Sequence, residues 1–298
     1  MPRVLITGVQ GFTGRYVAAE LERHGWDVWG LGSQPSDVPR YHCVDLLDGV
    51  ALRGVIELVQ PDAVVHLAAI AFVGHGDVDA FYRVNLLGTR HLLEALAHSP
   101  HPLQCVLLAS SANVYGNATE GVLTEATPPQ PANDYAVSKL AMEHMARLWM
   151  DKLPIVIARP FNYTGVGQSV TFLLPKIVAH FQQRASVIEL GNLHVWRDFS
   201  DVRAVAQAYR RLLEVCPSGE TVNVCSGRLQ SLGEVIELVQ NLAGYKIRVD
   251  VNQAFVRANE VKTLCGDGSR LRSLIGDWDS PPLRDTLRWM LETAHVGA

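Results

Sequence analysis

The start of the chain places the strongest constraint on its fold. The apolar run Arg3–Thr7 leads directly into glycines at positions 8, 11 and 14, and residues 12–25 follow with a helical pattern. A strand, a glycine-rich turn and a helix in this order bring free backbone N–H groups and the positive end of a helix dipole to the strand end. This arrangement predicts a turn that binds a phosphate group; an ordinary glycine-rich turn is the alternative.

Each glycine of the turn has its own expected role. Gly8 permits a tight exit from the strand, Gly11 lets the backbone approach a pyrophosphate, and Gly14 allows close packing of helix on strand. The spacing is G-x-x-G-x-x-G rather than G-x-G-x-x-G. We therefore expect a dinucleotide-binding turn, which Phe12 and Thr13 complete.

Short apolar runs then alternate with longer helical stretches through the first half of the chain. Strand, helix and strand in repetition are typical of a doubly wound parallel sheet with helices on both faces and right-handed crossovers. We expect strands at 27–31, 63–67, 105–109 and 155–158, and helices at 50–59, 78–98 and 134–150.

The alternation is looser beyond residue 159, where glycines separate four further helical patterns. This change predicts a Rossmann dinucleotide-binding domain over residues 1–162, with returns to it near 195–225. A smaller, interleaved α/β substrate domain is expected over 163–298. Its helices should lie near 172–183, 202–215, 232–243 and 283–292.

Composition excludes several classes of function. The formal net charge is −4, with 26 Lys and Arg against 30 Asp and Glu, so no basic excess favours nucleic acid. No apolar run reaches the roughly 18 residues of a membrane-spanning helix, and the N-terminus does not resemble a secretion signal. The five cysteines form no C-x-x-C pair and the histidines no cluster. We expect a cytoplasmic protein with reduced thiols and no metal site.

Tyr135 and Lys139 are four residues apart in the expected helix 134–150, and therefore on one face of it. A nearby ammonium stabilises a phenolate and so lowers the pKa of a phenol, which suits a tyrosine that transfers protons. The alternative is an amphipathic helix with a partly buried tyrosine and a solvated lysine.

Ser110 and Ser111 follow the apolar strand Cys105–Ala109. The carboxyl ends of strands form the ligand crevice of a doubly wound sheet, so a serine there can donate a hydrogen bond to a carbonyl oxygen. Such a serine is more often a helix cap when it occurs alone. Together with the glycine turn and the Tyr135/Lys139 pair, the serines predict a catalytic site.

This combination resembles the nucleotide-sugar branch of the extended short-chain dehydrogenase/reductases over nearly the whole chain. Further shared motifs are Asp45-Leu46, His66-Leu67-Ala68-Ala69, Val84-Asn85, Gly88-Thr89, Arg159-Pro160-Phe161-Asn162, Arg197-Asp198-Phe199 and the segment 257–267.

The resemblance implies a role for each matched residue. Ser111, Tyr135 and Lys139 would be the catalytic triad, and Tyr135 and Lys139 would also contact the cofactor. Asp45 and Leu46 would meet adenine, and Leu67, Ala68 and Ala69 would line the dinucleotide. Ser110, Ser111, Tyr135, Asn162 and Arg197 would hold the substrate, Arg197 at its diphosphate, while Arg257 and Glu260 would hold the GDP end.

The end of the second expected strand bears on the choice of cofactor. It reads Gly30-Leu31-Gly32-Ser33, without the acid that usually meets the adenosine ribose and would repel a 2′-phosphate. No arginine lies there either, and Arg40 is the nearest basic candidate. We expect NADPH, with NADH as the alternative.

The resemblance also bears on the reaction. In the 4,6-dehydratases of this branch, acids follow the serine of the triad, whereas Ala112 and Asn113 follow Ser111 here. Neither can titrate, which leaves carbonyl reduction. The resemblance then implies reduction of the 4-keto group of GDP-4-keto-6-deoxy-D-mannose by NAD(P)H to give GDP-D-rhamnose. The alternatives are a nucleotide-sugar 4-epimerase that retains its NAD, a GDP-mannose 4,6-dehydratase and a non-catalytic dinucleotide-binding protein.

The resemblance finally implies a homodimer, in which the helical stretches 78–98 and 134–150 pair with their copies as a four-helix bundle.

Overall fold

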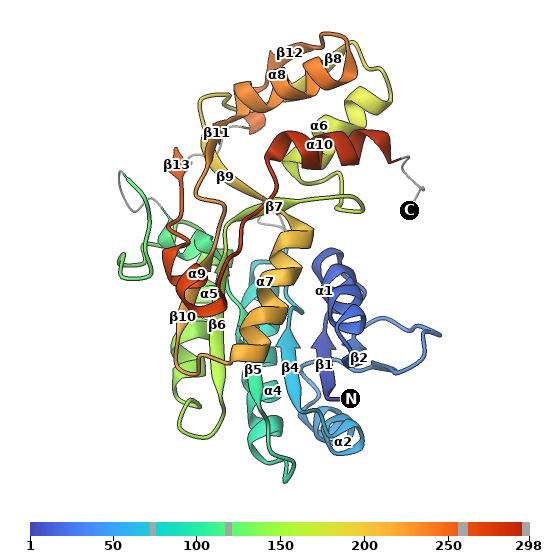
Figure 1. The fold of residues 1–298 in the computed structure, drawn as a ribbon, viewed down its shortest axis with the longest axis vertical. Coiled ribbons are helices and arrows are strands. Elements are labelled where there is room, and N and C mark those ends of the chain that lie inside the picture. Colours follow the sequence, from blue (N-terminus) through green and yellow to red (C-terminus); the bar gives the residue numbers. More distant parts are fainter. Residues whose placement is uncertain (72–75, 117–120, 256–261, 294–298) are drawn as a thin grey trace.

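A seven-stranded parallel sheet forms the larger body of the computed structural model, which describes residues 1–71, 76–116, 121–255 and 262–293. The strand order is β10-β6-β5-β4-β1-β2-β3. The doubly wound parallel sheet expected from the sequence is therefore confirmed (Figure 1). Its strands are β1 (Arg3–Thr7), β2 (Asp27–Gly32), β3 (Tyr41–Cys43), β4 (Ala63–His66), β5 (Cys105–Ala109), β6 (Ile155–Pro160) and β10 (Thr221–Val224).

Helices cover both faces of this sheet because successive strand residues point to opposite sides. In β1, Val4 and Ile6 join one apolar core, whereas Leu5 joins the other. The first core is closed by α1 (Phe12–Arg23), α7 (Val202–Val215) and α9 (Ser269–Ile275). The second is closed by α2 (Gly49–Val59), α4 (Thr89–Ala97) and α5 (Asp134–Arg147).

The stretch 78–98 is helical as expected, but its middle is wound differently. It consists of α3 (Val78–Ala80), the π-helix η1 (Phe81–Gly88) and α4. Asn85 of the π-helix accepts a hydrogen bond from the Ile70 amide at 2.9 Å and donates one to the Ser138 hydroxyl at 3.0 Å. The altered winding thus accompanies a buried polar contact between this helix, the segment after β4 and helix α5, and π-helical turns are frequent at functional sites.

The smaller body lies beyond the carboxyl ends of the large sheet (Figure 1). A third apolar core holds together its helices and its pair of parallel strands, β8 and β12. Its elements are α6 (Leu173–Gln182), β8 (Val187–Leu190), α8 (Leu232–Ala243), β12 (Arg248–Val251), the short helix η3 (Gln253–Phe255) and α10 (Leu283–Glu292).

A third sheet of short strands lies between the two bodies (Figure 1). Its strands are β7 (Asn162–Thr164), β9 (Trp196–Asp201), β11 (Leu229–Ser231) and β13 (Thr263–Leu264). After β9 the chain returns to the large body through α7 and β10, and it returns again through α9. The return through α9 is a feature that the sequence pattern does not predict. Within the described residues, no helix combines the length and apolar character needed to cross a bilayer.

Candidate active site

The carboxyl ends of β1, β4, β5 and β6 lie at one edge of the sheet and face the smaller body (Figure 1). Parallel strands bring the residues that follow them to the same edge, which is where doubly wound proteins bind ligands. The glycine turn follows β1, Leu67 follows β4, Ser110 follows β5 and Phe161 follows β6. Residues far apart in the sequence are thereby collected around one space.

The glycine turn has the conformation that its sequence requires. Gly8 has φ +71°, a left-handed conformation that favours glycine. A Cβ atom on Gly14 would stand 2.3 Å from the Gly8 carbonyl oxygen, so only glycine allows α1 to begin this close to β1. Gly11 is the N-cap residue of α1, and the Gly8 oxygen is all that a Cβ added there would approach, at 3.1 Å.

The N-terminus of α1 fits the diphosphate of a dinucleotide. It has no side-chain cap and no acid in its first turn. Asp48, Asn133, Asp201 and Ser231 cap α2, α5, α7 and α8 through their side chains, whereas α6 and α9 resemble α1 in having no such cap. The amides at the start of α1 therefore remain able to bind an anion supplied from outside the chain.

A buried histidine fixes the neighbouring strand end. The Thr89 hydroxyl donates to the Asn85 carbonyl at 2.8 Å, so it accepts from His66 Nε2, also at 2.8 Å. His66 Nδ1 then accepts from the Thr7 hydroxyl at 2.7 Å, and Thr7 accepts from the Ala68 amide at 3.2 Å. Burial lowers the pKa of His66 to about 3, so the ring is neutral and serves to position the residues 67–69 that follow β4.

The residues expected to meet the adenosine lie at the end of β2 and at positions 45–46. Asp45 is exposed, and its carboxylate accepts from the Leu47 amide at 2.9 Å, while Leu46 is buried and faces Gly88. β2 ends at Gly32, and neither Gly32 nor the following Ser33 carries a charge.

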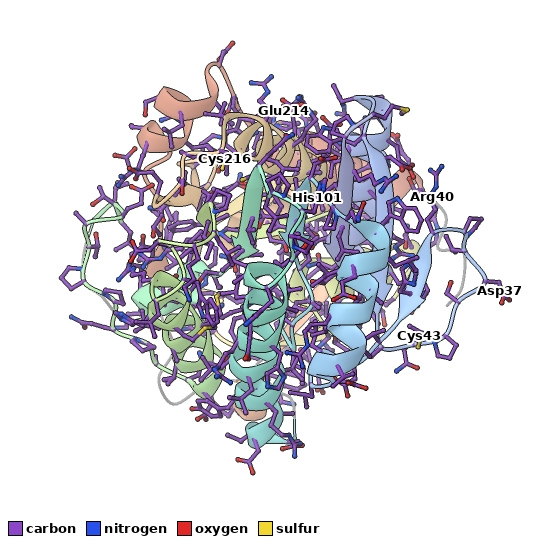
Figure 2. All side chains as sticks on the ribbon, turned by 90° about the horizontal axis from the view of Figure 1, so that it is seen from below. Asp37, Arg40, Cys43, His101, Glu214 and Cys216 are labelled. Atoms are coloured by element: carbon purple, nitrogen blue, oxygen red, sulfur yellow. The ribbon has the colours of Figure 1, made fainter. Side chains whose placement is uncertain are left out.

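Arg40 does not lie where a 2′-phosphate would require it. Its guanidinium binds the Asp27 carboxylate at 2.6 Å, and Asp27 begins β2 whereas the cofactor edge lies at the end of that strand. Figure 2 shows Arg40 with Asp37 and Cys43 at the margin of the molecule beside β2 and β3. Arg40 was the candidate for binding a 2′-phosphate because it is near the end of β2 in the sequence. The ion pair with Asp27 instead holds its side chain near the start of that strand.

Ser111, Tyr135 and Lys139 come from two elements that meet at this edge. Ser111 caps the short helix η2 (Ala112–Tyr115), and its oxygen accepts from the Asn113 amide at 3.1 Å. Tyr135 and Lys139 lie on α5 and are both buried. Lys139 Nζ donates to the Ala109 carbonyl oxygen at 2.8 Å, which joins α5 to the end of β5.

Burial controls the ionisation of the tyrosine and the lysine. It raises the pKa of Tyr135 to about 12, against a smaller lowering by a hydrogen bond with Ser111. The sequence argument expects the ammonium to lower this pKa, but in the structure burial outweighs any such effect. Burial also lowers the pKa of Lys139 to about 8, and the charge of Glu143 opposes that change. At neutral pH Tyr135 is thus protonated and able to donate.

Ser110 is bound inside the protein. Its hydroxyl donates to Glu143 Oε1 at 2.5 Å, and Glu143 in turn accepts two hydrogen bonds from Arg159. The hydroxyl group expected to bind substrate is therefore occupied by a buried carboxylate.

The expected substrate-binding residues Asn162 and Arg197 lie on paired strands, β7 and β9. Asn162 Nδ2 donates to the Asp198 carbonyl oxygen at 3.4 Å, and Arg197 Nη1 donates to the carbonyl oxygens of Trp196 and Lys262. Arg257 and Glu260 lie outside the described residues.

The structure adds residues that the sequence argument did not assign. Thr13 and Tyr163 share a hydrogen bond of 2.8 Å, and Tyr163 stacks on Phe12, so β7 contacts the glycine turn directly. The carboxylate of Asp198 accepts from the Ser226 and Gly227 amides at 2.9 and 2.8 Å. The unassigned residues are Tyr163 and Asp198. Each directly follows a residue of the shared motifs, Asn162 or Arg197, and this position could have indicated them.

Comparison with known proteins identifies the class. Residues 4–225 match the NAD dependent epimerase/dehydratase family, and the chain belongs to that family. It is an enzyme of the extended short-chain dehydrogenase/reductase type that uses a nicotinamide dinucleotide on a sugar nucleotide.

Two relatives narrow the similarity. One is the GDP-6-deoxy-D-talose 4-dehydrogenase of Aggregatibacter actinomycetemcomitans, 33% identical over 276 residues, which cover 92% of each chain. The other is the GDP-6-deoxy-D-mannose reductase of Pseudomonas aeruginosa, 35% identical over 300 residues, which cover 97% of this chain and 96% of that one.

Two solved structures share the fold over nearly their full length. A protein of Burkholderia cenocepacia J2315 with a provisional epimerase name is 53% identical, with a TM-score of 0.92 and coverage of 98% and 97%. The RMD protein of Pseudomonas aeruginosa, solved with NADPH, is 33% identical, with a TM-score of 0.85 and coverage of 98% of both chains.

Proposed function

We propose that this enzyme reduces the 4-keto group of GDP-4-keto-6-deoxy-D-mannose with NADPH and forms GDP-D-rhamnose. The observation that carries the proposal is the composition of the site around Ser111. A protonated phenol and a serine hydroxyl are present there, while the two positions after Ser111 hold Ala112 and Asn113. This set can protonate an alkoxide, and it lacks the acid that the dehydratases place after the serine.

The side chains have distinct tasks in the proposed reaction. Because Ser111 Oγ already accepts from the Asn113 amide, its own proton can be donated to the substrate carbonyl and polarise it. Tyr135 then gives its proton to the oxygen that becomes the hydroxyl group. The pKa of Lys139 is about 8, so below that pH the lysine supplies a positive charge one helical turn after the tyrosine. The reduced nicotinamide, when bound, supplies the hydride that C4 accepts.

The glycine turn and the strand ends would hold the dinucleotide. The uncapped start of α1 would bind the diphosphate through the amides of Phe12 and Thr13, with Gly11 letting the backbone approach it, and residues 67–69 would line the dinucleotide. NADPH is favoured over NADH because β2 ends without a carboxylate to repel a 2′-phosphate. The NADPH complex of the Pseudomonas aeruginosa structure supports the same choice.

Two other products or reactions remain as candidates. The Aggregatibacter actinomycetemcomitans relative is named for a talose sugar, which differs from the mannose configuration at C4, so GDP-6-deoxy-D-talose is the second candidate product. The second candidate reaction is 4-epimerisation with retained NAD, which uses the same triad and which the family description includes.

One experiment separates these candidates. The purified enzyme is incubated with GDP-4-keto-6-deoxy-D-mannose and either NADPH or NADH, and the product is examined by NMR. Parallel incubations hold GDP-mannose, or GDP-D-rhamnose without added cofactor. A large H3–H4 coupling indicates GDP-D-rhamnose, and a small one indicates the talose isomer. The proposal fails if the ketone is not reduced by either cofactor, or if the enzyme dehydrates GDP-mannose. Interconversion of sugar nucleotides at C4 without added cofactor would instead establish the epimerase.

A further inference from the structure

The carboxylate of Glu143 is completely buried one helical turn after Lys139. It accepts a hydrogen bond from the Ser110 hydroxyl at 2.5 Å and two from Arg159, through Nε at 2.9 Å and Nη2 at 2.6 Å. A paired guanidinium of this geometry stabilises an ionised carboxylate inside a core. The site therefore contains a buried ion pair behind its triad.

Arg159 is fixed from the other side. Its Nη1 donates to the Tyr115 hydroxyl at 3.0 Å, and its guanidinium lies 4.9 Å from the centre of the Tyr115 ring. The Tyr115 hydroxyl donates to Asn223 on β10 at 2.7 Å. Contacts from η2 and β10 consequently fix the position of this β6 cation. It cannot move freely when Glu143 is replaced.

Glu143 acts on the triad in two ways. It accepts a hydrogen bond from Ser110, which lies between Ala109 and Ser111 in the chain. The Ala109 carbonyl oxygen in turn accepts a hydrogen bond from Lys139 Nζ. It also supplies negative charge to Lys139. Other titratable groups of this region are His66 on β4, neutral with a pKa of about 3, and Tyr135 on α5, protonated at neutral pH. The Arg159 cation on β6, paired with Glu143, opposes part of the carboxylate charge.

We propose that Glu143 is a positioning residue for the triad: its buried carboxylate follows Lys139 by one turn of α5, and its hydrogen bond to Ser110 fixes the strand end that presents Ser111. This inference rests on the proposed role of the triad. It adds that the Glu143–Arg159 pair is part of the chemistry, and that its removal changes the protonation of Lys139 as well as the stability of the protein.

The test is the isosteric variant Glu143→Gln, which removes the charge and keeps the volume. The chain has five lysines, so labelling them with [ε-13C]lysine gives few NMR signals, and Lys139→Met assigns the one of interest. The Lys139 titration midpoint is expected at lower pH in Glu143→Gln than in the wild type. The kcat/KM of Glu143→Gln at pH 7 should be about 10-fold or more below that of the wild type, mainly through kcat, because the reacting groups are displaced.

Two further variants keep the test decisive. Glu143→Gln leaves Arg159 unpaired in the core, so Glu143→Gln/Arg159→Met serves if the single variant does not fold. It removes both charges and should shift the Lys139 midpoint in the same direction but less, because loss of the Arg159 cation offsets part of the loss of the Glu143 charge. The matched control is Glu20→Gln, which breaks the buried pair between Glu20 of α1 and Arg210 of α7, 2.9 Å apart. This control should leave the Lys139 midpoint unchanged.

A Lys139 midpoint in the folded Glu143 variants equal to that of the wild type would overturn the inference, as would an equal shift in Glu20→Gln. The NMR readout requires no substrate. If the midpoint shifts as expected and no ketone is reduced by the wild type, the charge coupling stands and the proposed function fails. If the wild type reduces the ketone and the midpoint does not move, the proposed function stands and the inference fails.

Discussion

Lys139 Nζ donates a 2.8 Å hydrogen bond to the carbonyl oxygen of Ala109, two residues before Ser111. This contact joins helix α5 to the end of β5, so the two parts of the proposed triad are held in one arrangement. The ammonium is therefore a structural link as well as the charge that the proposed triad requires, and the predictions below separate these roles from those of the tyrosine.

The first prediction concerns the proton donor. Tyr135→Phe keeps the ring that packs near Phe81 but loses the hydroxyl, so turnover of the ketone should fall by about 10²- to 10⁴-fold. Binding of NADPH, measured by fluorescence titration, should change little. A kcat close to that of the wild type would remove Tyr135 from the proposed role.

The second prediction is a pH dependence. The pKa of Lys139 is lowered from 10.5 to about 8, so the ammonium is present below pH 8 and lost above it. The value of kcat/KM should be independent of pH near neutrality and should fall as the pH rises through about 8. Tyr135, with a pKa of about 12, remains protonated over this range.

Unfolding does not account for such a loss. Between pH 8 and the ordinary range of lysine the unfolded chain binds more protons at this residue than the folded chain, so the Lys139 contribution to the free energy of unfolding rises with pH. Circular dichroism should show an intact fold throughout the fall in activity. A pH profile that stays level to pH 9.5 would contradict the assignment.

The third prediction uses two glycines with opposite surroundings. Gly14→Ala places a Cβ 2.3 Å from the Gly8 carbonyl oxygen, so the protein should lose about 1–3 kcal/mol of stability and bind NADPH more weakly. Gly54→Ala in α2 meets nothing within 4 Å and should gain about 0.5–1 kcal/mol. Urea denaturation measures both, and equal effects would show that the turn at Gly14 is not tightly packed.

The fourth prediction concerns the nucleotide. If Arg197 holds the diphosphate, Arg197→Ala should raise KM for the GDP-linked ketone at least about 10-fold with a smaller change in kcat, because the contact is remote from C4. If Arg257 and Glu260 bind the GDP end, Glu260→Ala should likewise act mainly on KM.

A substrate comparison accompanies these variants. The wild type should use the GDP-linked ketone far better than its dTDP-linked counterpart, since unpaired buried polar groups make such discrimination large. Equal turnover of the two would leave the reductase chemistry intact and remove the guanine-specific role of Glu260.

The fifth prediction is a homodimer formed by the helical stretch 78–98 and α5. Apolar side chains on both are exposed in the single chain, at 46% for Val78, 43% for Leu87 and 38% for Val137. Light scattering at micromolar concentration should report about twice the mass of 32.7 kDa, and Leu87→Arg should weaken the association. A mass near that of one chain in the wild type would contradict the dimer.

Local patterns were enough to predict much of this fold. The strands β1 and β5 occupy their expected ranges, and α7, α8 and α10 begin and end at the expected residues. The short strands β3, β7, β11 and β13 went unpredicted because two or three residues carry no periodicity, and their existence depends on the strand each one pairs with.

Some features of the candidate site likewise follow from the sequence, and others only from the packing of the elements. The spacing of Tyr135 and Lys139 follows from the helical period, and the place of Ser111 follows from the end of a strand. The direction of the Arg40 side chain, in contrast, is set by Asp27, and that of the Ser110 hydroxyl by Glu143. Neither partner can be identified from its spacing in the sequence, because these contacts form only when separate elements pack together.

By itself, the sequence predicted the main alternation of strands and helices, the glycine turn and the proposed triad residues, since these depend on backbone geometry and on side-chain period over a few residues. Only the tertiary structure decided how those residues ionise. Burial raises the pKa of Tyr135 and lowers that of Lys139, and the buried Glu143, paired with Arg159 from β6, opposes the second change. Ionisation depends on what surrounds a group in space, and residues 16 or more positions apart supply part of that surrounding.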